Sequence, residues 1–328
     1  MGVKEVPLDQ LLSNKSYIFF SHTHKGQKRN IPLLSRICSN GITLYDYELI
    51  TEKGKRLVAF GKFAGYAGMI NSLNGLGDVL LSRGIRSPFI HIPLTHYYRN
   101  IDHVKRSIKE LGENIKIKGI SKDVNPIVFT FTGKGNVSQG AREIFNLLPH
   151  EWIEPIDLKE AVFSDLRRDR VYGCIVEAKD YIKPKSEGIS FDYENYLSNP
   201  EMFESHFHES IAPFSTVIIN GIYWESKYPR LLTKEQMKQT QSKYQNRLLT
   251  IADISCDIEG SIEFMNKAST IDEPFYYYDT INDSYSNDRM LSGVQIMSID
   301  NLPTELPEDS SKHFGNQLLP IIPSLVRS

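Results

Sequence analysis

Short apolar runs alternate with helical patterns along almost the whole chain. Apolar runs indicate strands at residues 17–20, 42–48, 56–60 and 89–94. Between the last two, apolar residues recur every three or four positions from Phe63 to Leu80, which predicts a long helix. Its glycines at 65, 68, 75 and 77 lower helix propensity but allow another backbone to pack closely. Apolar positions 104, 108 and 111 predict a second helix behind Asn100, a residue that can cap it.

The same alternation continues from residue 125 onward. Strands are expected at residues 127–131, 171–176, 216–219, 248–254 and 294–299. Helices are expected at 139–147, behind the capping box of Thr233 and Gln236, and near 313–322. The segment 272–288, rich in Asp, Asn, Ser and Tyr, indicates a loop. Near-continuous apolar strands alternating with helices predict an α/β protein with a doubly wound parallel sheet.

Composition narrows the function classes. The length of 328 residues predicts about two domains. The 38 basic and 40 acidic residues give a net charge of −2, and no basic stripe with interleaved aromatics occurs, so we expect no nucleic-acid partner. Cys38, Cys174 and Cys256 are far apart, which favours a reducing compartment over disulfides or a cysteine zinc site. The uncharged stretch 63–77 is too short to span a membrane, and residues 1–5 show neither a signal nor a transit peptide.

The strongest local signal is a glycine turn between a strand and a helix. Gly133 and Gly135 match the first two glycines of a dinucleotide fingerprint, while Ser138 stands where the third belongs. The first glycine permits a tight turn, and the second lets a pyrophosphate approach the helix N-terminus. Glu154 lies 21 residues after Gly133, where an acidic residue would hold a ribose hydroxyl and favour NAD. The alternative reading of Glu154 is a surface carboxylate before a proline.

Other polar residues follow predicted strands. His22, next to His24 and Lys25, is a candidate proton donor or acceptor, or else a solvated loop residue. On a strand, His22 and His24 would point to opposite faces, so we expect no shared metal and assign no metal site. Asp257 is a candidate for the cofactor cleft because it follows an apolar strand, while Asp253 caps or pairs.

Several longer motifs resemble one family, the lysine–ketoglutarate reductase domain of the bifunctional aminoadipic semialdehyde synthases of animals and plants. The resemblance extends from residue 2 to about residue 324. More distantly, Val3-Lys4-Glu5 and Asp257 resemble alanine dehydrogenase and the fungal lysine-forming saccharopine dehydrogenase. The family motifs are Phe20 to Gln27, Arg56 to Gly61, Phe131 to Gly140, Ile219 to Glu225, Pro229 to Thr233, Ile251 to Phe264 and Ser298 to Pro303.

The resemblance implies that lysine condenses with 2-oxoglutarate and that a nicotinamide hydride reduces the imine to saccharopine. It implies NADPH as the cofactor, with NADH as the alternative. Lys4 and His22 match the acid–base pair, Asp257 would lie beside the nicotinamide, and Glu5 would set the pair's protonation. Glu48 and Arg56 would face substrate, although Lys55 is an alternative to Arg56. The expected cofactor contacts are Gly133, Gly135, Asn136, Val137, Glu154, Asn220, Asp300, Asn301 and Leu302.

The resemblance also implies a domain plan of two Rossmann-like domains. Residues 101–296 would form the cofactor domain, inserted in a catalytic domain made of residues 1–100 and 297–328. Compared with the family, this catalytic domain lacks roughly eighty upstream residues, on the scale of typical domain sizes. The saccharopine dehydrogenase half would follow in a longer chain, and an unpaired sheet edge would favour a homo-oligomer. Localisation would be mitochondrial for an animal protein and cytoplasmic for a plant one. Two alternatives stay open: an NAD-dependent lysine-forming saccharopine dehydrogenase, and a non-catalytic cofactor-binding remnant.

Overall fold

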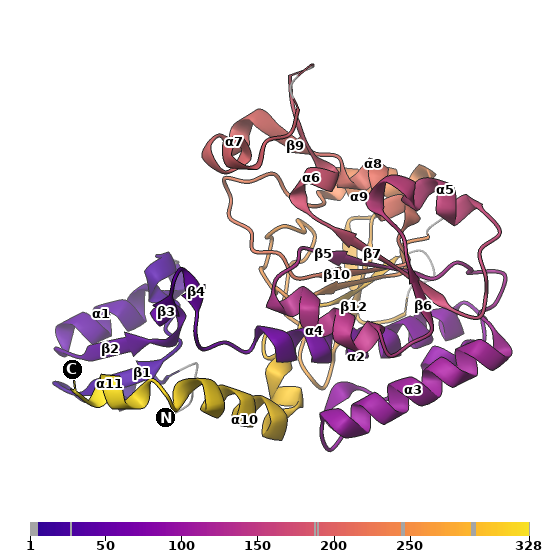
Figure 1. Ribbon diagram of the computed structural model, residues 1–328. Coiled ribbons are helices and arrows are strands. Elements are labelled where there is room, and N and C mark those ends of the chain that lie inside the picture. The colour runs from indigo at the N-terminus through magenta and orange to yellow at the C-terminus, as the bar shows by residue number, and fades with distance from the viewer. Residues whose placement is uncertain are drawn as a thin grey trace. The chain divides into compact units, whose positions relative to one another are not determined.

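The computed structural model describes residues 6–26, 28–186, 188, 190–243, 247–289 and 293–327. The chain divides into two compact units (Figure 1). Unit 1 comprises residues 1–60 and 309–328, and unit 2 comprises residues 61–308. The predicted assignment of 1–100 and 297–328 to substrate binding, and of 101–296 to the cofactor, stays a prediction.

Unit 1 is built on a strand–helix–strand motif. The strands β1 (Ser16–Phe19) and β2 (Thr43–Asp46) pair in parallel, and α1 (Ile31–Ser39) connects them. The short strands β3 (Thr51–Glu52) and β4 (Lys55–Arg56) form a hairpin. The chain returns to this unit through α10 (Pro307–Leu318) and α11 (Ile322–Arg327). Phe314 of α10 stacks on Phe60 and meets Tyr47 edge-on, which ties the C-terminal helix to the residues after β2.

Unit 2 contains an eight-stranded sheet in the order β13-β12-β14-β11-β10-β5-β7-β6. Six strands are parallel, and β12 and β13 form an antiparallel edge. The eight strands are β5 (Val128–Thr132), β6 (His150–Trp152), β7 (Val171–Val176), β10 (Val217–Asn220), β11 (Thr250–Asp253), β12 (Phe275–Asp279), β13 (Ser284–Ser286) and β14 (Val294–Met297). The doubly wound sheet predicted from the sequence is confirmed, with an antiparallel edge added.

Both faces of this sheet are buried, because successive side chains of a strand enter different cores. Phe129 and Phe131 of β5 belong to one core, while Val128 of the same strand belongs to the other. The helices α2 (Gly61–Ser82), α3 (Ile101–Lys118) and α4 (Asn136–Phe145) cover the first face (Figure 1). The second face is covered by α5 (Leu158–Phe163), α8 (Phe207–Ser210) and α9 (Lys234–Lys243). A segment with α6 (Ala178–Tyr181), α7 (Tyr193–Ser198) and the antiparallel pair β8 (Ile182–Pro184) and β9 (Phe203–Ser205) follows β7.

Three local predictions from the sequence are confirmed: two helix caps and one close contact between helices. The Asn100 side chain accepts a hydrogen bond from His103 N at the start of α3. Thr233 and Gln236 form the predicted capping box before α9. A Cβ on Gly65 would lie 2.1 Å from Val137 O, so α2 and α4 pack as closely as the glycines of α2 suggested.

Three element predictions are wrong. Residues 89–94 do not form a strand, because Pro88 opens a 3-10 turn at Pro88–His91 that buries Phe89. Of the strand expected at 56–60, only Arg56 pairs, as part of the two-residue strand β4, which pairs with β3. The expected loop at 272–288 contains the β12–β13 hairpin, whose register pairs Tyr277 with Ser286. The polar residues of its turn indicated a loop, although the aromatic residues of β12 have high β-propensity.

Candidate active site

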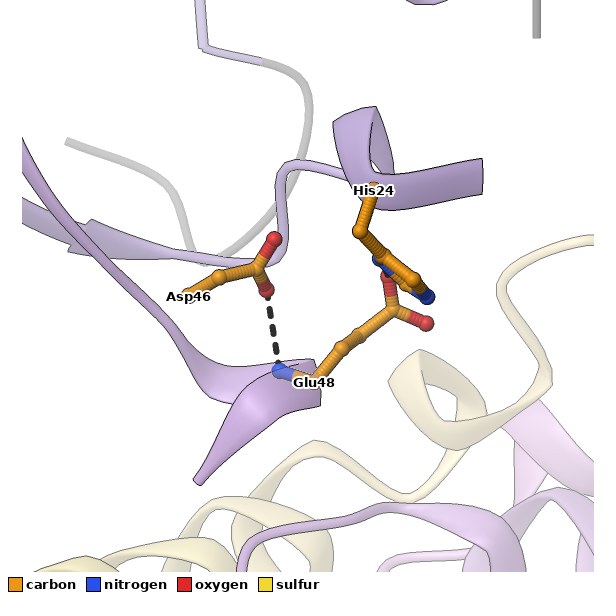
Figure 2. A group of neighbouring side chains, drawn as sticks. All are labelled: His24, Asp46 and Glu48. Carbon is orange, nitrogen blue, oxygen red and sulfur yellow. Dashed lines mark hydrogen bonds and ion pairs between the residues drawn. The ribbon is translucent and has the colours of Figure 1, made fainter. Parts of the chain in front are cut away.

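Glu48 is a buried carboxylate of unit 1 on which several charged side chains converge. It lies just after β2, and its side chain is 3% exposed. Asp46 positions it, because Oδ1 of Asp46 accepts a 2.9 Å hydrogen bond from Glu48 N while Oδ2 accepts one from Ser21. Figure 2 shows the Asp46 carboxylate turned toward the Glu48 backbone, with the Glu48 side chain extending away from it.

Three side chains that can carry positive charge converge on Glu48. Oε2 lies 2.9 Å from Nδ1 of His22 and 3.4 Å from Nδ1 of His24, and Oε1 lies 3.2 Å from Nη2 of Arg56. The expectation that the two histidines point to opposite faces is wrong, because neither lies on a strand. His22 adopts a left-handed conformation with φ of 54°, and His24 follows on a 3-10 turn (Thr23–Lys25). The change of backbone direction brings both rings to one carboxylate.

This arrangement suits proton transfer to a bound small molecule. The side chains of His22 and His24 are 27% and 33% exposed, whereas that of Glu48 is buried. An imidazole placed in this way can hold its proton on Nδ1, the nitrogen that faces the carboxylate, and exchange one through Nε2. Nε2 of His22 is itself buried and has no hydrogen-bond partner among the described residues. Arg56 supplies a planar donor of the kind that holds carboxylates.

Three groups in this cluster could also surround a metal ion. One ligand atom each from His24, Asp46 and Glu48 lies within 4.8 Å of the others. However, both Asp46 oxygens already accept hydrogen bonds, and the Arg56 guanidinium lies against Glu48. In Figure 2 the His24 ring lies over the Glu48 carboxylate, while Asp46 faces the backbone. The donor set therefore favours an ion-pair network over cation binding.

Two predicted residues of this cluster, Lys4 and Glu5, lie outside the described residues, and so does the side chain of Lys55. The structure therefore places His22, Glu48 and Arg56 together. Sequence reasoning missed Asp46 and treated His24 as pointing elsewhere. The signal that could have found Asp46 is its position two residues before Glu48, where an aspartate commonly caps a short turn.

The glycine turn of unit 2 lies at the end of β5. Gly133 has φ of 74°, a conformation that L side chains rarely adopt, and its N–H donates to Val176 O at 2.8 Å. Gly135 precedes α4, and a Cβ added there would meet nothing within 4 Å. Asn136 and Val137 form the first turn of α4. The turn thus leaves open space at a helix N-terminus, which is what a pyrophosphate needs.

The third glycine of the fingerprint is missing, and Gly140, two residues further on, allows a close contact between two helices instead. A Cβ on Gly140 would lie 2.1 Å from Lys62 O, so it allows α2 to approach α4. Ser138, at the fingerprint position, is buried. The departure from the fingerprint is therefore compensated by a glycine that serves helix–helix packing.

A cavity of about 490 Å³ adjoins the glycine turn. Its wall includes Lys134, which forms a 2.5 Å ion pair with Glu177 at the end of β7. Glu154 does not line this cavity, because it follows β6 at the sheet edge, and β7 lies between β6 and β5. The cavity is lined by Gly133, Lys134, Gly135, Glu177, Ala178, Tyr181, Tyr193, Tyr196, Leu197, Gly221, Ile222, Tyr223, Trp224, Tyr228, Pro229 and Leu231.

The remaining predicted cofactor residues lie at neighbouring strand ends. Asn220 is fully buried and is hydrogen-bonded to Thr132, Asp253 and Ser261. Asp257 is half-buried in the turn after β11, where Gly260 N donates to its carbonyl. Beyond β14, Asp300 is exposed and Asn301 is half-buried, whereas Leu302 is 1% exposed in the core against α2. Their contacts with a cofactor stay predictions.

Within the described part of the chain, no helix has the length and apolar character needed to cross a membrane.

A mainly parallel, doubly wound sheet whose central strand ends in an open glycine turn defines an α/β protein with a Rossmann-type fold. The fold is similar to that of an L-alanine dehydrogenase, with a TM-score of 0.52 and 14% identity over 98% of this chain and 68% of that chain. No protein-family model matches the sequence.

The sequence is homologous over its whole length to part of the α-aminoadipic semialdehyde synthases. It is 43% identical to that of Arabidopsis thaliana over 99% of this chain, and 41% identical to the mitochondrial one of Bos taurus over all of it. The chain spans about a third of the length of these relatives, 32% and 37%. A saccharopine dehydrogenase (NAD+, L-lysine-forming) of Emericella nidulans is 27% identical over 98% of this chain and 72% of its own length.

Proposed function

We propose that this chain condenses L-lysine with 2-oxoglutarate and reduces the resulting imine to saccharopine, the reaction of lysine–ketoglutarate reductase. The observation that carries the proposal is the pairing of His22 with buried Glu48 in a homologue of the α-aminoadipic semialdehyde synthases. The homology to lysine-forming saccharopine dehydrogenases supports the same chemistry, because their name describes the reverse reaction.

Unit 1 would supply proton transfer. Imine formation passes through a carbinolamine, whose formation moves a proton from nitrogen to oxygen and whose dehydration needs a proton on the departing hydroxyl. Nε2 of His22 would exchange these protons, because Nδ1 is held by Glu48. The Glu48 carboxylate would stabilise the imidazolium between steps, and Arg56 would hold a substrate carboxylate. Lys4 and Glu5, as predicted partners of His22, belong to the same proposal.

Unit 2 would hold the nicotinamide dinucleotide. The open turn at Gly133 and Gly135 fits the pyrophosphate, with Asn136 and Val137 presenting the first amides of α4. When bound, the cofactor supplies the hydride, while the protein supplies position and charge. Asp257, Asp300 and Asn301 are proposed to approach it from the ends of β11 and β14.

The reductant is proposed to be NADPH, as the resemblance implies, with Lys134 as the cation beside a 2′-phosphate. One observation favours NADH instead. Glu177 ends the strand next to β5, which is where an acidic residue accepts hydrogen bonds from a ribose diol and repels a phosphate. Because Glu177 pairs with Lys134, these two side chains would together determine whether NADPH or NADH is preferred.

The longer relatives suggest further features of the whole protein. Because they are about three times the length of this chain, we propose that a saccharopine dehydrogenase half accompanies it in a longer polypeptide. The animal relatives are named mitochondrial, so a mitochondrial location is proposed if the source is an animal and a cytoplasmic one if it is a plant. A homo-oligomer stays a prediction.

The test is oxidation of NADPH, and then of NADH, by the purified chain with lysine and 2-oxoglutarate both present. Each substrate is omitted in turn, and His22→Ala is assayed beside it. Turnover that requires both substrates and is lost in the variant supports the proposal. A folded protein that binds NADPH by fluorescence but gives no turnover contradicts it and favours the cofactor-binding remnant.

A further inference from the structure

A buried hydrogen-bond network joins the ends of three central strands in unit 2. Thr132 Oγ1 at the end of β5 donates to Asn220 Oδ1 at 2.8 Å. Asn220 Nδ2 at the end of β10 donates to Asp253 Oδ1 on β11 at 3.0 Å and to Ser261 Oγ at 3.0 Å. Ser255 Oγ donates to the same Asp253 oxygen at 2.5 Å. All three strand-end residues are fully buried, at 0% exposed.

Both ends of this network reach segments proposed to hold the cofactor. At one end, Thr132 precedes Gly133, and its hydroxyl also accepts from Gly221 N at 3.1 Å, on the wall of the cavity. At the other end, Asp253 O accepts from Cys256 N at 3.3 Å, in the turn that leads to Asp257. Backbone pairing adds a further link, because Ile254 N donates to Asn220 O at 2.8 Å.

Within this network, Asp253 is the residue whose burial costs the most free energy. A buried carboxylate loses hydration, and Oδ2 has no hydrogen-bond partner among the described residues. Asp257, in the turn that follows, is a like charge that interacts with Asp253, and Tyr276 of β12 is a titratable group that interacts with it from another strand. A residue that served packing alone would be apolar here, as its neighbours Ile251, Ala252 and Ile254 are.

We propose that Asp253 is a positioning residue, which through Asn220 and Thr132 on one side and Ser255 on the other fixes the Gly133 turn and the Asp257 turn relative to each other. The inference rests on the proposed function and extends it to a residue that does not itself contact cofactor or substrate. Fixing the two turns together would align the nicotinamide with the pyrophosphate anchor, so the network would affect hydride transfer more than substrate affinity.

The test compares Asp253→Ala with Asp253→Asn. Alanine removes the acceptor from Asn220 and Ser255, whereas the carbonyl oxygen of asparagine can accept both hydrogen bonds. For Asp253→Ala we expect NADPH, measured by fluorescence, to bind about tenfold more weakly and kcat to fall on the order of 100-fold. KM for lysine should stay unchanged, and Asp253→Asn should restore most of both losses. Asp279→Ala is the matched control, because Asp279 is a buried carboxylate at the end of β12 in the antiparallel edge.

Thr132→Val gives a second measurement that leaves the carboxylate intact. It removes the donor to Asn220 and the acceptor of Gly221 N while keeping the side-chain volume. In a double-mutant cycle on the NADPH dissociation constant, Asp253→Ala and Thr132→Val should be non-additive, because each breaks the same chain of hydrogen bonds.

The outcomes separate this inference from the function it extends. A wild-type chain that binds neither NADPH nor NADH overturns both. A wild-type chain that binds the dinucleotide, with Asp253→Ala binding it equally well or with additive effects in the cycle, overturns the positioning role alone. Equal losses in Asp253→Ala and Asp279→Ala would likewise overturn it, because they would show a general cost of losing buried carboxylates.

Discussion

Nδ1 of His22 lies 2.9 Å from Oε2 of Glu48, and His22 reaches this position only through a left-handed backbone with φ of 54°. Glu48 in turn is held by Asp46, whose two oxygens accept hydrogen bonds from Glu48 N and Ser21. The acid–base candidate is thus oriented by a buried carboxylate that is itself fixed. The proposed acid–base chemistry of unit 1 depends on these successive contacts, from the His22 ring to Glu48 and from Glu48 to Asp46.

Glu48→Gln should lower kcat for lysine and 2-oxoglutarate by about 100-fold, the scale of positioned acid–base catalysis. The amide keeps the shape of the side chain but removes the charge that faces His22, His24 and Arg56. NADPH affinity, measured by fluorescence, should not change, because the glycine turn belongs to unit 2. Glu52→Gln, an exposed carboxylate in β3 of the same unit, is the control. Equal rates for Glu48→Gln and Glu52→Gln would refute this role for Glu48.

His22→Asn separates chemistry from backbone strain, because asparagine tolerates the left-handed conformation better than alanine. We expect it to lose activity by about 100-fold while keeping the wild-type midpoint of thermal unfolding. His24→Asn should lose less, since its Nδ1 is 3.4 Å from Glu48 rather than 2.9 Å. Steady-state rates and thermal melts of both variants check this. A larger loss for His24→Asn would assign proton transfer to the other ring.

The regular elements were predictable where periodicity was strong. The inner strands β5, β7, β10, β11 and β14 are buried on both faces, so continuous apolar runs such as residues 171–176 identify them. The edge hairpin was missed because Asp279 and the polar turn after it look like loop residues, although Asp279 caps that turn by accepting from Ile281 N. At Phe89, burial against a helix produced the same apolar pattern as a strand.

The candidate site was predictable only in part, because a sequence shows spacing but not the direction of the chain. The two histidines were expected to point in opposite directions, but the left-handed conformation of His22 brings both rings to Glu48. Likewise, the ribose candidate was sought at Glu154 by its distance from Gly133, whereas strand order places β7 and Glu177 beside the glycine turn. Strand order depends on tertiary pairing, which no local pattern specifies.

Gly135→Ala and Gly140→Ala should separate binding from folding. A Cβ at Gly135 meets nothing within 4 Å, so the variant should fold normally but bind NADPH at least tenfold more weakly, because the methyl group occupies the pyrophosphate space. A Cβ at Gly140 would lie 2.1 Å from Lys62 O, and overpacking of this kind costs about 1–3 kcal/mol or more. Urea unfolding and fluorescence titration of both proteins test the assignment. Unchanged NADPH binding in Gly135→Ala would remove the turn from the cofactor site.

Glu177→Ser should raise the preference for NADPH over NADH. The change removes the carboxylate that would repel a 2′-phosphate and frees Lys134 from its 2.5 Å ion pair. We expect the ratio of kcat/KM for NADPH to that for NADH to rise about tenfold, which corresponds to roughly 1.4 kcal/mol. Glu154→Ser, at the sheet edge, should leave this ratio unchanged. If instead Glu154→Ser raised the ratio and Glu177→Ser left it unchanged, Glu154 rather than Glu177 would be the residue that contacts the ribose.

Glu305 should make unit 2 less stable as the pH rises. Burial raises the pKa of this carboxyl from 4.5 to about 7, although Asn71 Nδ2 donates to it at 2.8 Å. Between these two values the folded chain binds a proton that the unfolded chain releases, so stability falls with rising pH across this window, by about 3 kcal/mol in all. Glu305→Gln cannot ionise and should lack this component, while Asp253, whose pKa is raised to about 6, contributes equally to both proteins. Urea unfolding from pH 4.5 to 7.5, followed by the fluorescence of Trp152 and Trp224, measures the difference, since both tryptophans lie in unit 2. Parallel stability curves for wild type and Glu305→Gln would show that Glu305 is not held protonated in the fold.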